Sequence, residues 1–550
     1  MATDLENIER LLSRFIRPIP PGDEYQNRLA EEFELILNQR FTDYFLQICD
    51  IIDLTRDLVH MTRGSAGSSL VCYLLGITDV DPVEWNIPVA RFMNPLRDDL
   101  PDVDIDFEHH QQTEVMERIF QKWPGKTARL SNYVTYKEKS ARREAAKRLG
   151  ATGNLPRNFT YESIGVDPKE AKRIERKLIG KKRAISKHCG GIVMFTRQLP
   201  KSLITQDNQI LLDKHEIEDL EHLKVDILAN RGLSQLLEID PDTPLAAYPR
   251  TDLRTAALLR RGDVLGVTQG ESPAMRRLFR AIQPTCVEDC VFATAMVRPV
   301  AMSGRQKAAM FQDWSQEAVQ DAVVFEDDAI DIISNIIGVD HYEADMYRRA
   351  FAKKNDEKIL EFVERLGNNP RKADAMAALQ ELSGFGLCRA HAVNLGRLIW
   401  ALAYQKAHNP ELFWAANLRH CEGSYRPWVY QTEAHRRGID TKPGWWQQGF
   451  PQGCGIRQRW LERVEYTGVI ANGRVFRGRN GRWVTFLTVG TDYGEYADIQ
   501  IPRAFAYRDG DIAHGTGVIR HGNNSDHIQS THCELYSFAD WAKHSAKRQR

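Results

Sequence analysis

Residues 101–107 read PDVDIDF, and this heptapeptide constrains the fold more than any other segment of the chain. An extended strand directs successive side chains to opposite faces, so Asp102, Asp104 and Asp106 share one face and three apolar side chains share the other. Like charges about 7 Å apart along one face destabilise a strand unless cationic groups lie against them. The segment therefore predicts a strand with one buried apolar face and one acidic face that binds cations.

Divalent metal ions are one solution for the acidic face, because hard cations prefer carboxylate oxygens. Two neighbouring carboxylates on a strand suit a pair of metal ions about 4 Å apart, the arrangement used in phosphoryl transfer. A solvated acidic face and a structural calcium site are the alternatives. The heptapeptide by itself does not choose among these interpretations, or among its three aspartates.

The composition is that of a globular protein, with 550 residues, 42% hydrophobic and 27% charged. This length allows about two to four domains. The chain has no apolar run of the roughly 18 residues that a membrane span needs, and its N-terminus is unlike a signal peptide, so we expect a cytoplasmic protein without membrane contact. The nine cysteines form no CxxC pair and the histidines form no HxxxH or HExxH motif, so a zinc site is not expected.

The net charge is zero, but the charge is unevenly distributed along the chain. Residues 121–187 contain 19 Lys and Arg against 6 Asp and Glu. Residues 137–149 and 168–179, within this segment, have the character of helices. Basic helices gathered in one region indicate a polyanion-binding surface, and a solvated helical surface is the alternative.

Periodicity predicts the remaining elements. Residues 24–39 have helical spacing, whereas residues 190–195 and 223–228 are typical of buried strands. Residues 61–70 are expected to form a small-residue loop that runs into a short apolar strand at 71–75.

The second half of the chain divides into three kinds of sequence. Residues 240–420 are predicted to be mostly helical. From residue 464, short alternating strands separated by Asn-Gly and Tyr-Gly turns favour a small β-barrel such as an OB-fold, with any other small β-domain as the alternative. The last residues form a basic tail that we expect to be disordered.

Five motifs extend the pattern: RGSAGSSL at 63–70, RFMNP at 91–95, KHCGG at 187–191, LKVD at 223–226 and ADMYRRA at 344–350. In this order, and together with the acidic heptapeptide, they resemble the alpha subunit of bacterial DNA polymerase III, a family C DNA polymerase. The resemblance runs from about residue 24 to residue 440. The family's large N-terminal PHP domain has no counterpart ahead of this segment, so the sequence resembles a short form of the family.

The resemblance implies an α/β multidomain fold with a nucleotidyltransferase-like mixed-sheet palm, a helical thumb and fingers, and a C-terminal OB-like barrel. The implied domains are palm 1–129, thumb 130–186, second palm part 187–240, fingers 241–420, shortened linker or helix-hairpin-helix remnant 421–463, OB-like domain 464–530 and basic tail 531–550.

The resemblance also assigns site residues. Asp104, Asp106 and Asp226 correspond to the catalytic carboxylates that bind two Mg²⁺ ions, with Mn²⁺ as an alternative, whereas Asp102 is not implied to be a ligand. The residues implied to bind the nucleotide are Gly64, Ser65, Ser68, Arg91, Arg97, Lys224, Arg348 and Arg349. The residues implied to bind DNA are Lys137, Lys139, Arg142 and Arg143.

The implied function is template-directed DNA synthesis by two-metal-ion phosphoryl transfer, in a minimal enzyme of phage or mobile-element replication or of translesion synthesis. The implied partners are primer–template DNA, dNTPs and a sliding clamp or other replication proteins. Two alternatives remain at this point: a catalytically weak, polymerase-derived DNA-binding scaffold, and a metal-dependent nuclease that uses the same acids. In this chain, acidic residues at 326–328 replace the family's YQEQ, which we expect to alter DNA contacts or nucleotide selection.

Overall fold

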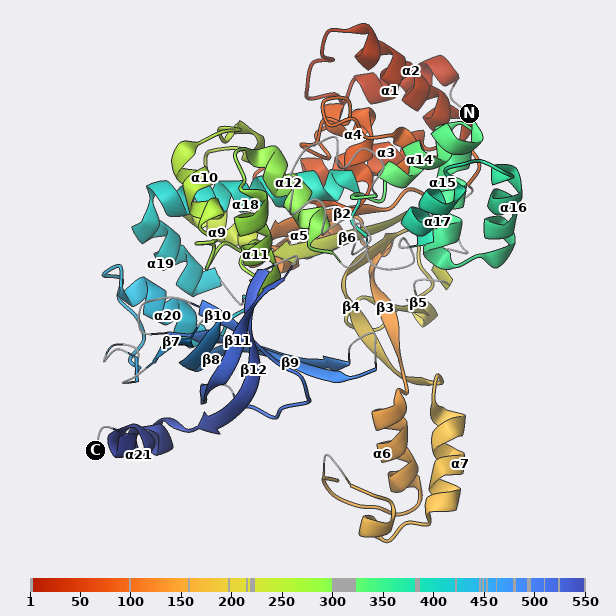
Figure 1. The fold of residues 1–550 in the computed structure, drawn as a ribbon. Helices are drawn as coiled ribbons and strands as arrows, with labels where there is room; N and C mark the ends of the chain where they lie inside the picture. The colour runs from red at the N-terminus through yellow and green to blue at the C-terminus, as the bar shows by residue number, and fades with distance from the viewer. Residues whose placement is uncertain are drawn as a thin grey trace.

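The computed structural model has a mixed β-sheet near its middle, helices around it and a β-barrel at the C-terminal end (Figure 1). This is the fold class that the sequence predicts. None of the described helices combines the length and apolar character needed to cross a bilayer. The structure describes residues 3–548 except 98–99, 157–158, 196–197, 214–215, 218–222, 299–322, 381–385, 421–422, 445–446, 448–449, 452–453, 461, 478–480, 492–495, 509 and 523–524.

The central sheet has six strands in the order β1-β2-β6-β4-β3-β5. β2 pairs with β6 in parallel and β3 pairs with β5 in parallel, whereas the other neighbours are antiparallel. The strands predicted at 190–195 and 223–228 are confirmed within β4 and β6. The bounds are β1 (His60–Arg63), β2 (Val103–Glu108), β3 (Thr127–Thr135), β4 (Lys182–Met194), β5 (Gln209–Asp213) and β6 (Leu223–Asn230).

The N-terminal helices bury the apolar face of β2, where Val103, Ile105 and Phe107 have no exposed surface. The prediction for residues 61–75 is wrong in two respects: residues 61–63 belong to β1, and the apolar run at 71–75 forms helix α4. The Ser69 hydroxyl caps this helix by accepting a hydrogen bond from the Cys72 amide, which selects a helical turn for the short apolar run. The helices are α1 (Asp4–Leu12), α2 (Asp23–Asn38), α3 (Thr42–Asp53), α4 (Leu70–Leu74) and α5 (Gln112–Lys122).

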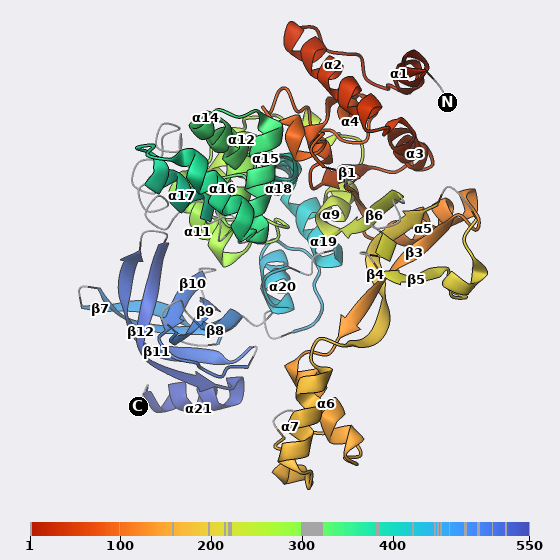
Figure 2. The ribbon, with the colours of Figure 1, turned by 90° about the vertical axis from the view of Figure 1, so that its right-hand side faces the viewer.

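The two predicted basic helices are confirmed as α6 (Glu138–Arg148) and α7 (Pro168–Leu178). They stand at the far end of the long strands β3 and β4 and project from the rest of the molecule (Figures 1 and 2). The carboxylate of Asp167 caps α7 by accepting from the Lys169 amide, and a proline occupies the first helical turn. A small apolar cluster that includes Phe159 and Tyr161 stabilises this projection.

Residues 231–435 are mostly helical wherever they are described, as the sequence predicts. The long helix α18 lies in a large apolar cluster with Trp400 and Trp414, and a second cluster around Tyr347 and Phe362 joins α14, α15, α16 and α17. The helices are α9 (Arg231–Ile239), α10 (Leu253–Arg260), α11 (Pro273–Ile282), α12 (Val287–Met296), α14 (Asp328–Ile337), α15 (His341–Lys353), α16 (Asp356–Leu366), α17 (Lys372–Gln380), α18 (Arg389–His408), α19 (Pro410–His420) and α20 (Pro427–His435).

The C-terminal strands form a closed barrel in the order β8-β9-β10-β12-β11, which closes through pairing of β11 with β8. β7 adds to β8 outside this ring, and β10 and β12 are its parallel pair. The arrangement confirms an OB-like barrel. The bounds are β7 (Gly455–Trp460), β8 (Arg463–Arg477), β9 (Trp483–Gly490), β10 (Tyr496–Ile501), β11 (Ile512–Gly522) and β12 (Ser525–Tyr536).

The basic tail is ordered, contrary to the expectation of disorder. β12 continues to Tyr536, and α21 (Phe538–Arg548) follows it. Trp541 is buried, with its ring 5.3 Å from that of His514 and 5.4 Å from that of Tyr536. One large aromatic side chain packed against the barrel thus orders a segment whose charge suggested a free end.

Candidate active site

Three aspartates meet on two neighbouring strands of the central sheet. Asp104 of β2 lies directly opposite Asp226 of β6 in the parallel register, and Asp106 lies two residues further along β2. Paired residues on adjacent strands direct their side chains to the same face, as do residues two apart on one strand. The structure therefore brings together the three carboxylates that the resemblance selected, although 120 residues separate the last two along the chain.

Asp106 is almost fully buried and has two polar partners. Arg63, at the end of β1, places its Nη2 2.5 Å from Asp106 Oδ1, and the Asn230 side-chain amide donates to Oδ2 at 3.0 Å. Burial raises the pKa of Asp106, and the Arg63 charge opposes that rise. Sequence reasoning did not assign a role to either partner: Asn230 belongs to no motif, and Arg63 begins the RGSAGSSL motif, in which only Gly64, Ser65 and Ser68 were assigned to the nucleotide.

Asp104 lies between other acids on the same face of the sheet. Burial, together with the negative charges of Asp102 and Asp226, raises the pKa of Asp104 to about 7. Lys224 opposes this effect, since its Nζ lies 3.1 Å from a carboxylate oxygen of each of these two neighbours. The sequence assigned Lys224 to the nucleotide, whereas in the structure it lies within the acidic cluster.

The carboxylate oxygens fit a divalent cation. Asp104 Oδ1 and Asp226 Oδ1 are buried and receive no hydrogen bond from any described residue, whereas Asp106 Oδ1 is paired with the Arg63 guanidinium. Buried acceptors without hydrogen bonds raise the free energy of the fold, and hard cations such as Mg²⁺ bind this kind of oxygen. The donor set, three carboxylates of which two have a buried oxygen without a hydrogen bond, therefore matches the ligands expected for Mg²⁺ or Mn²⁺.

Gly64 places backbone beside the acids. It follows β1 with a φ of +68°, and a Cβ built there would lie 3.3 Å from Asp104 Oδ2. A residue with a side chain is disfavoured in this conformation, so the motif requires glycine. Ser65 follows Gly64 and directly precedes the short 3₁₀ helix at residues 66–68. Its side chain is partly exposed, whereas that of Ser68 is fully buried.

A buried carboxylate fixes the small-residue loop. Glu32 of α2 has no exposed surface and accepts hydrogen bonds from the Ser69 hydroxyl at 2.6 Å and from the amides of Leu70 and Val71 at 2.7 and 3.0 Å. Arg28, one turn earlier, pairs with Glu32 at 2.7 Å. Sequence reasoning missed this support, because the sequence does not distinguish a buried acid on an amphipathic helix from a solvent-exposed one.

Three of the arginines predicted to bind the nucleotide converge on two acids. Arg91 and Arg348 lie 2.7 and 3.6 Å from Glu326, and Arg97 and Arg348 lie 3.6 and 2.7 Å from Asp345. Glu326 is one of the acids that departs from the family pattern. Its carboxylate thus pairs with these two arginine side chains and does not lie on a solvent-exposed surface. Arg349, the neighbour of Arg348 in α15, has partly exposed surface.

The four residues predicted to bind DNA all lie on the projecting helix α6 or at its start. Lys137 and Lys139 are exposed. Arg142 instead lies over the rings of Phe159 and Tyr161, at 5.0 and 5.6 Å. Arg143 donates to the Pro156 carbonyl oxygen at 3.4 Å, so both arginines also stabilise the projection itself.

Comparison with known families matches this architecture. Residues 6–229, which contain the three aspartates, match the model of the bacterial DNA polymerase III alpha NTPase domain. Residues 232–373, which contain Glu326 and Arg348, match the finger domain of the same subunit. The chain belongs to the bacterial DNA polymerase III alpha family. The resemblance seen in the sequence is confirmed.

Individual members of the family show the same relationship. An error-prone DNA polymerase of Saccharophagus degradans is 29% identical over 456 residues, or 72% of this chain and 44% of that protein. An error-prone DNA polymerase of Rhodopirellula baltica is 29% identical over 508 residues, or 80% of this chain and 44% of that protein. The DNA polymerase III subunit alpha of Staphylococcus epidermidis is 30% identical over 462 residues, or 73% of this chain and 43% of that protein. The chain therefore spans less than half the length of these relatives.

Proposed function

We propose that the protein is a template-directed DNA polymerase that adds dNTPs to the 3′-hydroxyl of a primer. The main support is the register that sets Asp104 opposite Asp226 and beside Asp106, within the segment that matches the polymerase NTPase domain. It would act in the cytoplasm on primer–template DNA, with a sliding clamp or other replication proteins as further partners.

The three aspartates would hold two Mg²⁺ ions, or Mn²⁺ in their place, and Asp104 and Asp226 each offer a buried oxygen that receives no hydrogen bond from a described residue. When bound, such ions supply Lewis-acid activation of the primer hydroxyl and neutralisation of phosphate charge. The chain itself contributes rigidity, because β2 and β6 fix the carboxylates and Arg63 and Lys224 reduce their mutual repulsion. Gly64 keeps the approach to Asp104 open for phosphate oxygens.

The arginine cluster would hold the triphosphate. Arg91, Arg97 and Arg348 stay charged at neutral pH and can grip phosphate oxygens with two parallel hydrogen bonds. Glu326 and Asp345 keep these side chains together in the absence of nucleotide. Because Glu326 pairs with two of them, it would compete with the incoming triphosphate for their charge.

DNA would contact two further surfaces. The exposed Lys137 and Lys139 on the projecting helices would attract the phosphates of the duplex. On the barrel, the rings of Phe476 and Phe486 are stacked 5.8 Å apart with an interplanar angle of 4°, and Trp483 is 51% exposed. The exposed Trp483 and the partly exposed phenylalanine pair on this OB-like barrel are suited to stacking on the bases of a single-stranded template.

Primer extension tests the proposal, with Asp106→Ala compared against Asp102→Ala. Both residues lie on the same face of the PDVDIDF segment, but the Asp102 side chain is 53% exposed whereas Asp106 is buried. We expect Asp106→Ala to lower extension in Mg²⁺ by about two orders of magnitude or more while DNA affinity is retained. Asp102→Ala should lower it by less than about tenfold, because it removes only an exposed partner of Lys224.

Two results would contradict the proposal. Wild-type extension by the Asp106→Ala variant would remove the carboxylates from catalysis. Failure of the wild-type protein to extend a primer, despite tight DNA binding in the presence of Mg²⁺ and all dNTPs, would support a polymerase-derived scaffold instead.

A further inference from the structure

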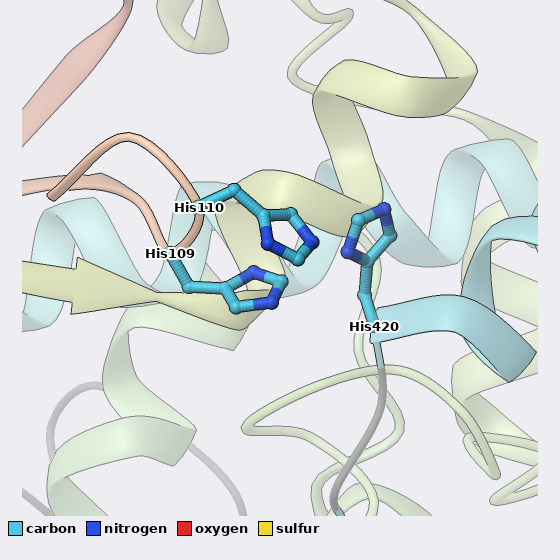
Figure 3. Close-up of side chains that lie close together, drawn as sticks. All are labelled: His109, His110 and His420. Atoms are coloured by element: carbon cyan, nitrogen blue, oxygen red, sulfur yellow. The ribbon is translucent and has the colours of Figure 1, made fainter. Parts of the chain in front are cut away.

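Three histidines from distant parts of the chain meet at the carboxyl end of β2. His109 and His110 form the turn that follows this strand, and His420 is the last residue of α19. A ligand nitrogen from each ring lies within 4.8 Å of the other two. The ring centroids of the first two are 3.7 Å apart, and His420 lies 5.3 and 5.6 Å from them (Figure 3).

His420 is buried, and only one of its ring nitrogens has a hydrogen bond. Its Nε2 lies 2.5 Å from a carboxylate oxygen of Glu238 in α9, while its Nδ1 has no hydrogen-bond partner among the described residues. The Glu238 carboxylate can only accept a hydrogen bond, so Nε2 carries the hydrogen and Nδ1 of the neutral ring carries a lone pair. In Figure 3 the His420 ring faces the other two histidines.

His109 has a tautomer that is set by Ser234. Both the backbone amide and Nδ1 of His109 lie within 2.9 Å of Ser234 Oγ, and this hydroxyl donates its own hydrogen to the Asn230 carbonyl oxygen. The hydroxyl therefore accepts from Nδ1–H, which leaves the lone pair of His109 on Nε2. His110 is exposed, so the cluster is accessible from solvent.

We propose that His109, His110 and His420 form a second metal site, which binds a divalent transition-metal ion of the zinc class. Imidazole nitrogens suit such ions, whereas carboxylate oxygens suit Mg²⁺, so this site differs in chemistry from the three aspartates. A carboxylate or hydroxyl that holds the opposite ring nitrogen is a regular feature of histidine metal ligands, and Glu238 and Ser234 supply these contacts. An otherwise unpaired buried nitrogen of His420 gains a partner.

The geometry needs only side-chain rotation. Zinc–nitrogen bonds of about 2.0–2.1 Å in a tetrahedron place ligand nitrogens about 3.3 Å apart, closer than the present limit of 4.8 Å. His110 is exposed and lies in a turn, so it can move toward His420 without disturbing the core. Water could supply a fourth ligand, because His110 is exposed.

The bound ion would link the end of the catalytic strand β2 to two helices, α19 directly and α9 through Glu238. His109 and His110 follow the strand that holds Asp104 and Asp106, whereas His420 ends α19 and Glu238 lies in α9. The ion would cross-link the catalytic strand to the adjoining helices and stabilise their contact. The inference rests on this side-chain cluster and does not depend on polymerase activity.

Cobalt titration of the full chain tests the site. The protein is freed of metal with a chelator and then titrated with Co²⁺ in excess Mg²⁺, which occupies oxygen ligands. We expect the visible absorption bands of nitrogen-bound, tetrahedral Co²⁺, displaced by Zn²⁺, and a higher unfolding temperature with Zn²⁺. His110→Gln and Glu238→Gln should each weaken binding at least tenfold. His341→Gln, a change at another exposed histidine, and Asp104→Asn should leave the cobalt spectrum unaltered.

The outcomes are decisive in both directions. Absence of the bands in the wild-type protein, or equal cobalt affinity of wild type and His110→Gln, would overturn the site. Because His110 is exposed, this variant should fold normally, and an unchanged circular dichroism spectrum verifies it. Loss of cobalt binding in Asp104→Asn would assign the ion to the carboxylates, which would also overturn the inference while leaving the proposed function intact.

Discussion

Asp104→Asn should stabilise the metal-free protein at pH 8 while it abolishes primer extension. The folded state raises the pKa of Asp104 from 3.8 to about 7, mainly through burial and the charges of Asp102 and Asp226. Above the unfolded pKa, ionisation favours the unfolded chain, so wild-type stability falls as the pH rises from about 4 to 7. At about 1.4 kcal/mol for each tenfold change, the total fall is about 4 kcal/mol.

An uncharged asparagine does not undergo this loss. We expect the unfolding free energy of Asp104→Asn at pH 8 to exceed that of the wild type by about 2 kcal/mol, half of this fall. The gain is not complete, because Arg63 and Lys224 each lose an anionic neighbour in the variant. For a unit of roughly 230 residues such as the central sheet with its helices, this corresponds to a rise in the unfolding temperature of about 4–8 °C. The gain should be small near pH 4.5, increase through pH 5 to 7 and level off above pH 7.

Scanning calorimetry in excess EDTA at several pH values measures this effect. Asp43→Asn is the control, since this carboxylate is 76% exposed and pairs only at the surface with Arg10. Addition of Mg²⁺ should raise the unfolding temperature of the wild type more than that of Asp104→Asn, because the ion binds the folded state alone. An unfolding temperature of Asp104→Asn equal to or below that of the wild type at pH 8 would refute the reasoning.

Three further predictions concern substrate binding. Glu326→Gln should lower KM for dNTPs several-fold in single-nucleotide incorporation, because it removes the acid that pairs with Arg91 and Arg348. An unchanged KM would place these arginines away from the triphosphate. Replacing Lys137 and Lys139 by Gln should weaken duplex binding and reduce the slope of log affinity against log salt by about 1–2, and an unaltered slope would exclude α6 from the DNA path. Trp483→Ala should weaken single-stranded template binding by about 1–3 kcal/mol without changing duplex affinity; equal losses for both would argue against base stacking.

Local periodicity predicted the acidic strand well. Alternation in PDVDIDF placed Val103, Ile105 and Phe107 on one face, and in the structure all three are fully buried. The same rule, applied to residues 223–228, gave a strand with Asp226 on one face. Strand alternation depends only on the backbone geometry of consecutive residues, so no knowledge of the rest of the chain is needed.

Other local predictions failed where packing opposed them. The apolar run at 71–75 could form either a strand or a helix, and the hydroxyl of Ser69 and the carboxylate of Glu32 favour the helix. The basic composition of the tail suggested disorder, but burial of Trp541 against the barrel orders α21. In both places a contact with a distant part of the chain decided the conformation.

The basic charge of α6 was visible in the sequence, but the sequence did not show which basic side chains are exposed and which pack against the protein. Lys137 and Lys139 are exposed, whereas Arg142 stacks on Phe159 and Tyr161. Charge counts do not distinguish a cation that faces a ligand from one that lies over an aromatic ring.

The sequence by itself determined that Asp104 and Asp106 share a strand face, that basic helices follow, and that the motifs are those of a polymerase family. Only the tertiary structure decided that Asp226 lies opposite Asp104, that Glu326 pairs with Arg91, and that His420 reaches the turn after β2. The physical reason is that strand and helix periodicity act over a few residues, whereas each of these contacts joins segments more than 100 residues apart, and their register is set by the packing of the whole fold.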